Sequence, residues 1–144
     1  MTIMGLDVGD RTIGVAVSDE LLITAQGLTT LHRKNLTADL AALMEIIQEY
    51  EVNQIVVGLP KNKDGSLGTQ SEKALSFVQQ LERLNIPVVT WDERFTTQEA
   101  ERVLIQAGLN WRKRREQVDK LAAVLILQGY LDCRRQRQPS ESLG

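Results

Sequence analysis

The sequence contains little of the chemistry that stabilises secreted proteins or anchors membrane proteins. Its single cysteine, Cys133, excludes an internal disulfide framework and a zinc site built on paired cysteines. No apolar run approaches the roughly 20 residues that span a bilayer, and no basic leader precedes an apolar stretch at the N-terminus. These absences predict a cytoplasmic protein without a membrane partner.

Histidine is equally scarce, and this limits the catalytic chemistry. The only histidine, His32, lies near the third predicted strand, and we expect it to be a surface residue rather than a general base. The sequence has no G-x-S-x-G motif, and no Ser-His-Asp triad can be assembled around a site distant from His32. A hydrolase with this sequence would therefore depend on a metal ion to generate its nucleophile.

Charge is nearly balanced overall but unevenly distributed. The formal net charge is −2, yet residues 1–110 contain nine basic and fifteen acidic residues, whereas residues 111–137 contain eight basic and three acidic ones. A polyanion would therefore bind near the end of the chain if it binds at all. The alternative interpretation of this basic segment is an ordinary solvated surface.

The chain of 144 residues shows no internal repeat and no linker, which predicts a single domain. Apolar periodicity predicts strands at Thr2–Asp7, Thr12–Ser18, Gly27–Leu31, Gln54–Leu59 and Val88–Trp91, and helices at Leu36–Ile47, Ala74–Leu84, Thr97–Gln106 and Glu116–Arg134. Three successive strands followed by strand–helix crossovers predict an α/β fold. Its mixed five-stranded sheet would have an antiparallel three-strand meander, two parallel strands and flanking helices. We expect the domain to cover residues 1–138 and residues 139–144 to form a flexible tail.

Acidic residues fall at the positions where such a sheet binds ligands, beyond the carboxyl ends of its parallel strands. Asp7 ends the first strand, and Asp92 and Glu93 end the last one. If that last strand continues, Asp92 and Glu93 point to opposite faces, so at most one of them belongs to a site. Asp119 is expected in the first turn of the final helix, where the helix dipole favours an anion.

Three converging carboxylates would repel one another unless cations lie between them. Ligation by oxygen alone suits Mg²⁺ or Mn²⁺, and two such ions about 4 Å apart can clamp the attacking and leaving oxygens of a phosphodiester. The alternative interpretation is that Asp7 is a turn residue, Asp92 a cap and Asp119 an ordinary helix charge. Spacing alone leaves both interpretations open.

Four motifs, taken together, are more specific than any one of these acids. They are GLDVGDRTIGVAVSD (5–19), VVGLPKNKDGSLG (56–68), DERFTT (92–97) and VDKLAAVLILQGYL (118–131). In this order they resemble the YqgF family, also called RuvX-like or Holliday-junction-resolvase-like. The resemblance implies a ribonuclease H-like fold. It also implies a nuclease that uses Mg²⁺ or Mn²⁺, with two ions, to process the 5′ end of precursor 16S ribosomal RNA; resolution of Holliday junctions is the older proposal for the family.

Carried over to this chain, the resemblance assigns the catalytic and metal-binding acids to Asp7, Glu93 and Asp119, with Asp92 as the alternative to Glu93. The family usually has two basic residues where this chain has Arg11 and Thr12, so one basic contact is missing here. Contacts to the nucleic-acid backbone are expected from basic residues in loops and in the stretch that precedes the last predicted helix: Arg11, Lys61, Lys63, Arg94, Arg112, Arg114 and Arg115.

Three functions stay open on the sequence alone. The first is a metal-dependent nuclease acting on precursor ribosomal RNA, free or in ribosomal precursor particles, as a monomer or homodimer. The second is a resolvase of branched DNA, which would act as a symmetric dimer. The third is a non-catalytic nucleic-acid-binding module. An actin-like kinase or ATPase is disfavoured, because that architecture needs two such domains.

Overall fold

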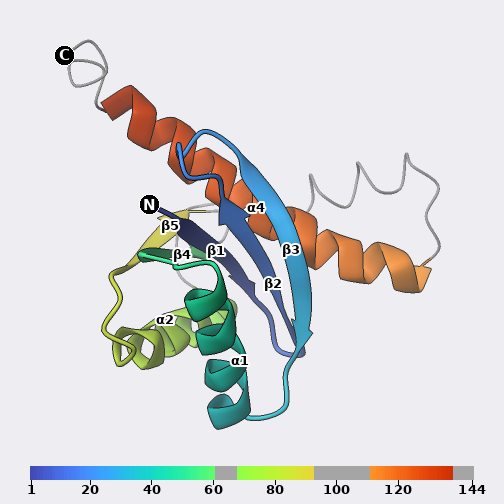
Figure 1. The fold of residues 1–144 in the computed structure, drawn as a ribbon. Coiled ribbons are helices and arrows are strands. Elements are labelled where there is room, and N and C mark those ends of the chain that lie inside the picture. Colours follow the sequence, from blue (N-terminus) through green and yellow to red (C-terminus); the bar gives the residue numbers. More distant parts are fainter. Residues whose placement is uncertain (61–67, 93–110, 138–144) are drawn as a thin grey trace.

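The computed structural model describes residues 1–60, 68–92 and 111–137, without the side chains of 111–117 and 137 (Figure 1). The strands in these ranges are β1 (Ile3–Val8), β2 (Thr12–Ser18), β3 (Ala25–His32), β4 (Gln54–Leu59) and β5 (Val88–Asp92). The helices are α1 (Leu36–Glu49), α2 (Thr69–Glu82) and α4 (Trp111–Arg137). None of the described helices is long and apolar enough to span a bilayer.

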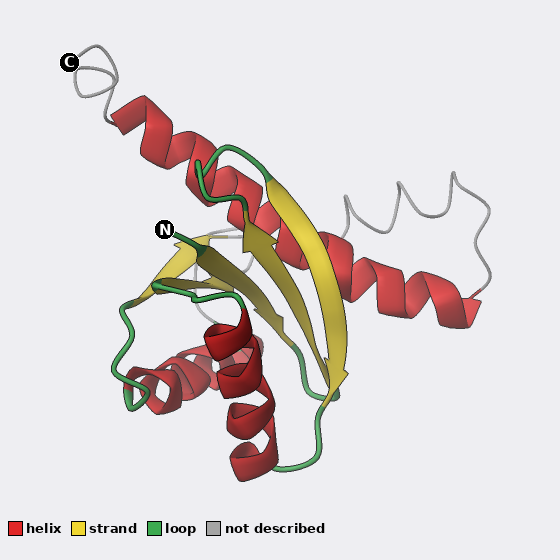
Figure 2. Cartoon of the chain, in the orientation of Figure 1, coloured by secondary structure: helices red, strands yellow, loops and turns green. Residues whose placement is uncertain are grey.

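The strands form one sheet in the order β3-β2-β1-β4-β5. β1 and β2 pair antiparallel, as do β2 and β3, whereas β4 runs parallel to both β1 and β5. The predicted α/β fold, with its antiparallel meander and two parallel strands, is therefore confirmed. Figure 2 shows the sheet between helices, with α1 and α2 on one face and α4 across the other.

Alternate residues of each strand supply two separate core layers, because successive side chains point to opposite faces of a sheet. On β1, Met4 and Leu6 pack with Leu43 of α1 and Phe77 of α2. Ile3, on the opposite face, packs in the layer formed with α4. The continuous apolar run of β4 serves both layers, as expected for a strand that is buried on both faces.

Glycines on the α4 face allow this helix to lie close to the sheet. A Cβ atom added to Gly5 of β1 would lie 2.7 Å from Cβ of Leu127, and one added to Gly14 of β2 would lie 2.0 Å from the carbonyl oxygen of Asp119. A residue with a side chain at Gly14 would therefore displace the helix. This close approach brings Asp119 directly over β2.

Several predicted boundaries were wrong, although the elements themselves exist. α2 begins at Thr69 rather than Ala74, and α4 begins at Trp111 rather than Glu116, because the first turns of both helices are polar and carry no apolar periodicity. β3 is longer than predicted, at Ala25–His32. The helix predicted at Thr97–Gln106 and the tail predicted at 139–144 lie outside the described residues.

Candidate metal centre

Asp7 and Asp119 lie next to each other on the sheet face covered by α4. Asp7, near the end of β1, pairs across the β1–β2 ladder with Gly14. The backbone of Asp119 rests on Gly14, so the two aspartates meet over the same point of the sheet. Both residues are partly buried. Two of the three acids predicted for the site are therefore brought together by residues far apart in the sequence.

The electrostatics of this pair favour a bound cation. Burial raises the pKa of Asp7 to about 7, and the negative charge of Asp119 contributes to the same rise. Ionising Asp7 beside Asp119 therefore costs free energy in the metal-free protein. A divalent cation between the two carboxylates would offset that cost, and carboxylate oxygens are the ligands that Mg²⁺ and Mn²⁺ prefer. The donor set thus fits such an ion.

Asp119 is held by a hydrogen bond rather than by a helix dipole. The prediction that it lies in the first turn of its helix was wrong, because α4 begins at Trp111 and Asp119 lies in the third turn. The dipole effect is confined to the first turn. Instead, the Oγ1 hydroxyl of Thr12, the first residue of β2, donates to Oδ2 of Asp119.

A pocket with a volume of about 670 Å³ opens beside Asp119, although its neighbour Asp7 does not line it. This volume is within the range of about 300–1,000 Å³ that is typical of ligand sites. Its lining residues come from the β1–β2 turn, the facing ends of β2 and β3, and α4: Gly9, Asp10, Arg11, Thr12, His32 and Asp119. Arg11 is exposed here, as a predicted contact to nucleic acid should be. His32 is exposed, as predicted for a surface residue, but it lines this pocket and pairs with Thr12 across the β2–β3 ladder, so the expectation of a site distant from His32 was wrong.

The other aspartate in the pocket lining, Asp10, is engaged by α2. Its Oδ1 atom accepts a hydrogen bond from Nζ of Lys73 at 3.0 Å, and its Oδ2 atom accepts one from Nε2 of Gln70 at 3.2 Å. The hydrogen bond from Lys73 is the main reason that the pKa of Asp10 lies below its ordinary value. Asp10 therefore fixes the turn that follows Asp7, and both of its oxygens have partners other than a metal ion.

Arg33 holds the same turn from the other side. Its Nη1 donates to the carbonyl oxygen of Gly9 at 2.9 Å, and its Nε pairs with Oδ2 of the buried Asp39 at 3.0 Å. The guanidinium also lies over the ring of Phe77, 5.1 Å from its centroid. The turn between β1 and β2 is thus anchored to both α1 and α2. Sequence reasoning missed Arg33 and Asp39, which carried no motif of their own.

The alternation of β5 bears on the choice between Asp92 and Glu93. Val89 and Trp91 of β5 pack in the core layer formed with α4. Asp92 follows Trp91 and therefore points to the opposite face, away from the face of Asp7. Glu93 lies outside the described residues. Within the described ranges, no cluster of three acidic, histidine or cysteine side chains suited to a metal ion is present.

The predicted nucleic-acid contacts are only partly described. Lys61, Lys63 and Arg94 lie outside the described residues. The backbone of α4 places Arg112, Arg114 and Arg115 in its first two turns, while their side chains are not described. In the view of Figure 1, this end of α4 projects beyond β3.

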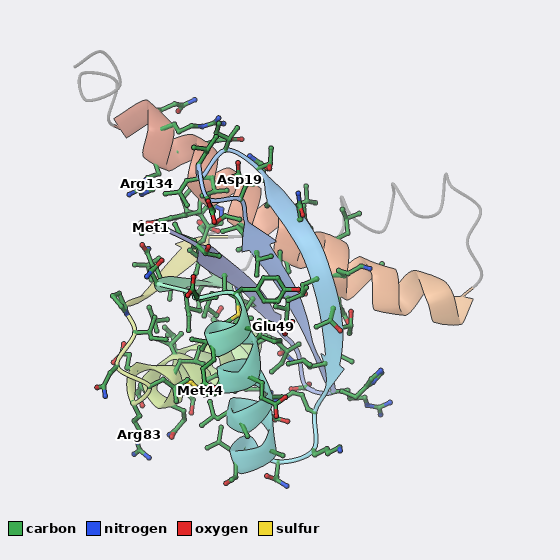
Figure 3. All side chains as sticks on the ribbon, viewed as in Figure 1. Met1, Asp19, Met44, Glu49, Arg83 and Arg134 are labelled. Atoms are coloured by element: carbon green, nitrogen blue, oxygen red, sulfur yellow. The ribbon has the colours of Figure 1, made fainter. Side chains whose placement is uncertain are left out.

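Asp19, which closes the first motif, does not belong to the site. It follows β2 and therefore lies at the end of that strand remote from Thr12, at the upper end of β2 in the view of Figure 3. Its Oδ1 atom accepts hydrogen bonds from the backbone N–H of Ile23 and of Thr24, at 2.7 and 3.0 Å. The backbone hydrogen bond from Thr24 is the largest cause of its lowered pKa. Asp19 thus stabilises the turn between β2 and β3.

Comparison with known protein families gives one match that spans nearly the whole chain. The RuvX family, described as Holliday junction resolvase, matches residues 1–133. Among curated proteins, one from Thermoanaerobacter pseudethanolicus is 55% identical over 139 residues, which cover 95% of this chain and 100% of that protein. One from Moorella thermoacetica is 56% identical over 133 residues, covering 92% and 95%. Both carry the name "Putative pre-16S rRNA nuclease".

Comparison with solved structures gives resolvases of the same fold. T. thermophilus RuvC in complex with a Holliday junction substrate superposes with a TM-score of 0.58 at 17% identity, covering 94% of this chain and 96% of that one. The fowlpox virus Holliday junction resolvase superposes with a TM-score of 0.56 at 13% identity, covering 92% and 99%. At these identities the likeness concerns the fold, and it agrees with the ribonuclease H-like architecture expected from the sequence.

Proposed function

The chain belongs to the RuvX family, and from this premise we propose that it is a metal-dependent nuclease that processes the 5′ end of precursor 16S ribosomal RNA. The observation that carries this proposal is the pair of partly buried carboxylates, Asp7 and Asp119, held together beside an open pocket. The close relatives bear the corresponding name and cover the chain almost end to end. The paired carboxylates suit metal-dependent cleavage of a phosphodiester, and the name of the relatives supports the same activity.

The site residues have distinct tasks in this proposal. Asp7 and Asp119 hold Mg²⁺ or Mn²⁺, and Glu93 supplies the third carboxylate, which would complete a site for two ions. Bound there, the ions supply activation of water and stabilisation of the charge that develops on the phosphodiester. Asp7 must give up its proton to bind an ion, and its raised pKa makes this step dependent on pH near neutrality.

Basic residues on one side of the site would position the nucleic-acid backbone. Arg11 lines the pocket and is exposed. The start of α4 contributes Arg112, Arg114 and Arg115, and Lys61, Lys63 and Arg94 are proposed as further contacts to the backbone. Contacts of this kind fix the register of a strand and carry no sequence information. The excess of acidic residues in 1–110 would disfavour a polyanion elsewhere on the surface.

We further propose that a single ribonuclease H-like domain covers residues 1–138, with 139–144 as a flexible tail. The protein acts in the cytoplasm on precursor ribosomal RNA, free or in ribosomal precursor particles, as a monomer or homodimer.

A second candidate, resolution of Holliday junctions, is favoured by the description of the family itself. A resolvase cuts two strands related by a two-fold axis, so it would act as a symmetric dimer. The same carboxylates would serve both reactions, and the substrate is what separates them.

Cleavage of two labelled substrates side by side tests the proposal. A 5′ fragment of precursor 16S rRNA and a four-way DNA junction are each incubated with the protein in Mg²⁺, in Mn²⁺ and in a chelator. We expect cleavage of the RNA that depends on the metal. Cleavage of the junction alone would establish the second candidate, and binding of either substrate without cleavage in any metal would indicate a non-catalytic module.

A further inference from the structure

In the described part of the site, the side chain of Thr12 contacts a proposed metal ligand without being one. It begins β2, and its Oγ1 hydroxyl donates to Oδ2 of Asp119 in α4. Sequence reasoning treated this position only as the place of a missing basic residue. In the structure, the threonine offers Asp119 a neutral hydroxyl donor. A lysine or arginine at this position would instead place a positive charge beside that carboxylate.

The hydrogen bond is not needed to hold α4 on the sheet. Ala123, Ile126 and Leu127 of α4 are fully buried against the sheet, and Gly5 and Gly14 allow the helix to approach closely. These contacts fix the backbone of Asp119 over Gly14. They leave the rotamer of the Asp119 side chain open, and the hydroxyl of Thr12 removes that freedom.

The position of Thr12 is also fixed independently of its hydroxyl. The backbone N–H of Gly9 donates to the carbonyl oxygen of Thr12 at 2.9 Å, which closes the turn between β1 and β2. The β1–β2 turn is also held by the hydrogen bond from Arg33 and by the contacts of Asp10 with α2. The donor therefore projects from a rigid support toward a carboxylate that could otherwise rotate away from Asp7.

We propose that Thr12 is a positioning residue of the nuclease site: its hydroxyl donates to Oδ2 of Asp119 and orients that carboxylate toward Asp7, so that the two aspartates would hold a divalent cation together. The inference rests on the proposed function and adds a residue that acts through a ligand rather than as one. Partners of metal ligands typically change metal affinity or activity about 10–100-fold when they are removed.

The test compares Thr12→Val, which keeps the shape and loses the hydroxyl, with Thr12→Ser, which keeps the hydroxyl. Thr29→Val is the matched control, because it makes the same substitution away from the site. Thr29 lies on β3, opposite Val15, on the sheet face turned to α1 and α2. The dissociation constant of Mn²⁺ is measured by titration calorimetry on the metal-free protein without RNA. Steady-state cleavage of the precursor RNA fragment then gives kcat and KM separately.

We expect Thr12→Val to bind Mn²⁺ about tenfold more weakly and to lose about tenfold in kcat, with KM for RNA unchanged. Thr12→Ser and Thr29→Val should resemble the wild type. Circular dichroism confirms the fold of each variant, and Thr12→Ala replaces the valine variant if that one does not fold. Unchanged Mn²⁺ affinity in a folded Thr12→Val protein would overturn the inference and leave the nuclease proposal standing. A wild-type protein that binds no Mn²⁺ and cuts no RNA would overturn both.

Discussion

The carboxylates of Asp7 and Asp119 lie side by side where α4 meets the sheet, and their repulsion lowers the stability of the fold whenever both are charged. Asp7 shows this directly, because burial and Asp119 raise its pKa to about 7. No cationic side chain is paired with the two aspartates in the described part of the chain. Under the proposed function, this arrangement would favour metal binding at the expense of stability.

The first prediction concerns the stability of the metal-free protein. Asp7 binds a proton more tightly in the folded chain than in the unfolded one, so its contribution to stability is greatest below the ordinary pKa of 3.8 and is lost as the pH rises through about 7. Asp7→Asn should therefore be more stable than the wild type at pH 8, by at most about 4 kcal/mol, and similar to it at pH 4.

Urea denaturation in a chelator at the two pH values measures this difference. Asp10→Asn is the matched control, because the pKa of exposed Asp10 is lowered rather than raised, and it should gain no stability at pH 8. A gain for Asp7→Asn that is equal at pH 4 and pH 8 would show that burial and Asp119 do not govern the ionisation of Asp7.

At the scale of the element, the contact between α4 and the antiparallel strands decides where Asp119 lies. Gly14 is the critical position, since an added Cβ would lie 2.0 Å from a backbone oxygen of the helix. Gly27 of β3 offers a contrast, because its added Cβ would meet Cγ of Lys120, at 2.8 Å, in a flexible side chain that can move.

The second prediction compares alanine at these two glycines. Gly14→Ala should destabilise the protein by about 2 kcal/mol or more, because the backbone of α4 must shift, and it should remove cleavage by displacing Asp119. Gly27→Ala should cost less and keep most of the activity. Thermal unfolding and RNA cleavage of both variants check this. Equal effects of the two substitutions would show that α4 does not rest on Gly14 as described.

The existence of the described helices and strands could be predicted from the sequence, whereas the starts of two helices could not. Short apolar segments, including the continuous apolar run of β4, identified every described strand, and the helical period identified α1, α2 and α4. The polar first turns of α2 and α4 carried no such signal, which is why Asp119 was predicted in a first turn and lies in the third. The start of α1 is fixed by its cap, because the side chain of Asn35 accepts from the N–H of Ala38 at 2.9 Å.

At the scale of the whole molecule, the sheet order brings the first strand to the centre and the last helix across it. Asp7 was a predicted candidate because it ends a strand, and Asp119 because it is an acid that was expected in the first turn of the final helix. The hydrogen bond from Thr12 was not predictable, because its partners are 107 residues apart and meet only after α4 has packed on β2. The role proposed for Glu93 rests on the family resemblance, while strand alternation directs Asp92 away from Asp7.

The fold places the basic segment of the chain in one helix. The basic segment 111–137 is the helix that carries Asp119, and its most basic end projects past β3 in Figure 1. A nucleic-acid strand that follows this end of α4 would be led toward the pocket beside Asp7 and Asp119.

The most direct test of the central claim is the rate of Mg²⁺-dependent cleavage of a 5′ precursor 16S rRNA fragment by the wild type, Asp7→Asn and Asp10→Asn. These aspartates flank one turn, but only Asp7 faces Asp119, whereas Asp10 is held by Lys73 and Gln70. We predict that Asp7→Asn remains folded and loses cleavage, while Asp10→Asn retains it. Wild-type cleavage by Asp7→Asn, or its loss in Asp10→Asn alone, would contradict the assignment of this site.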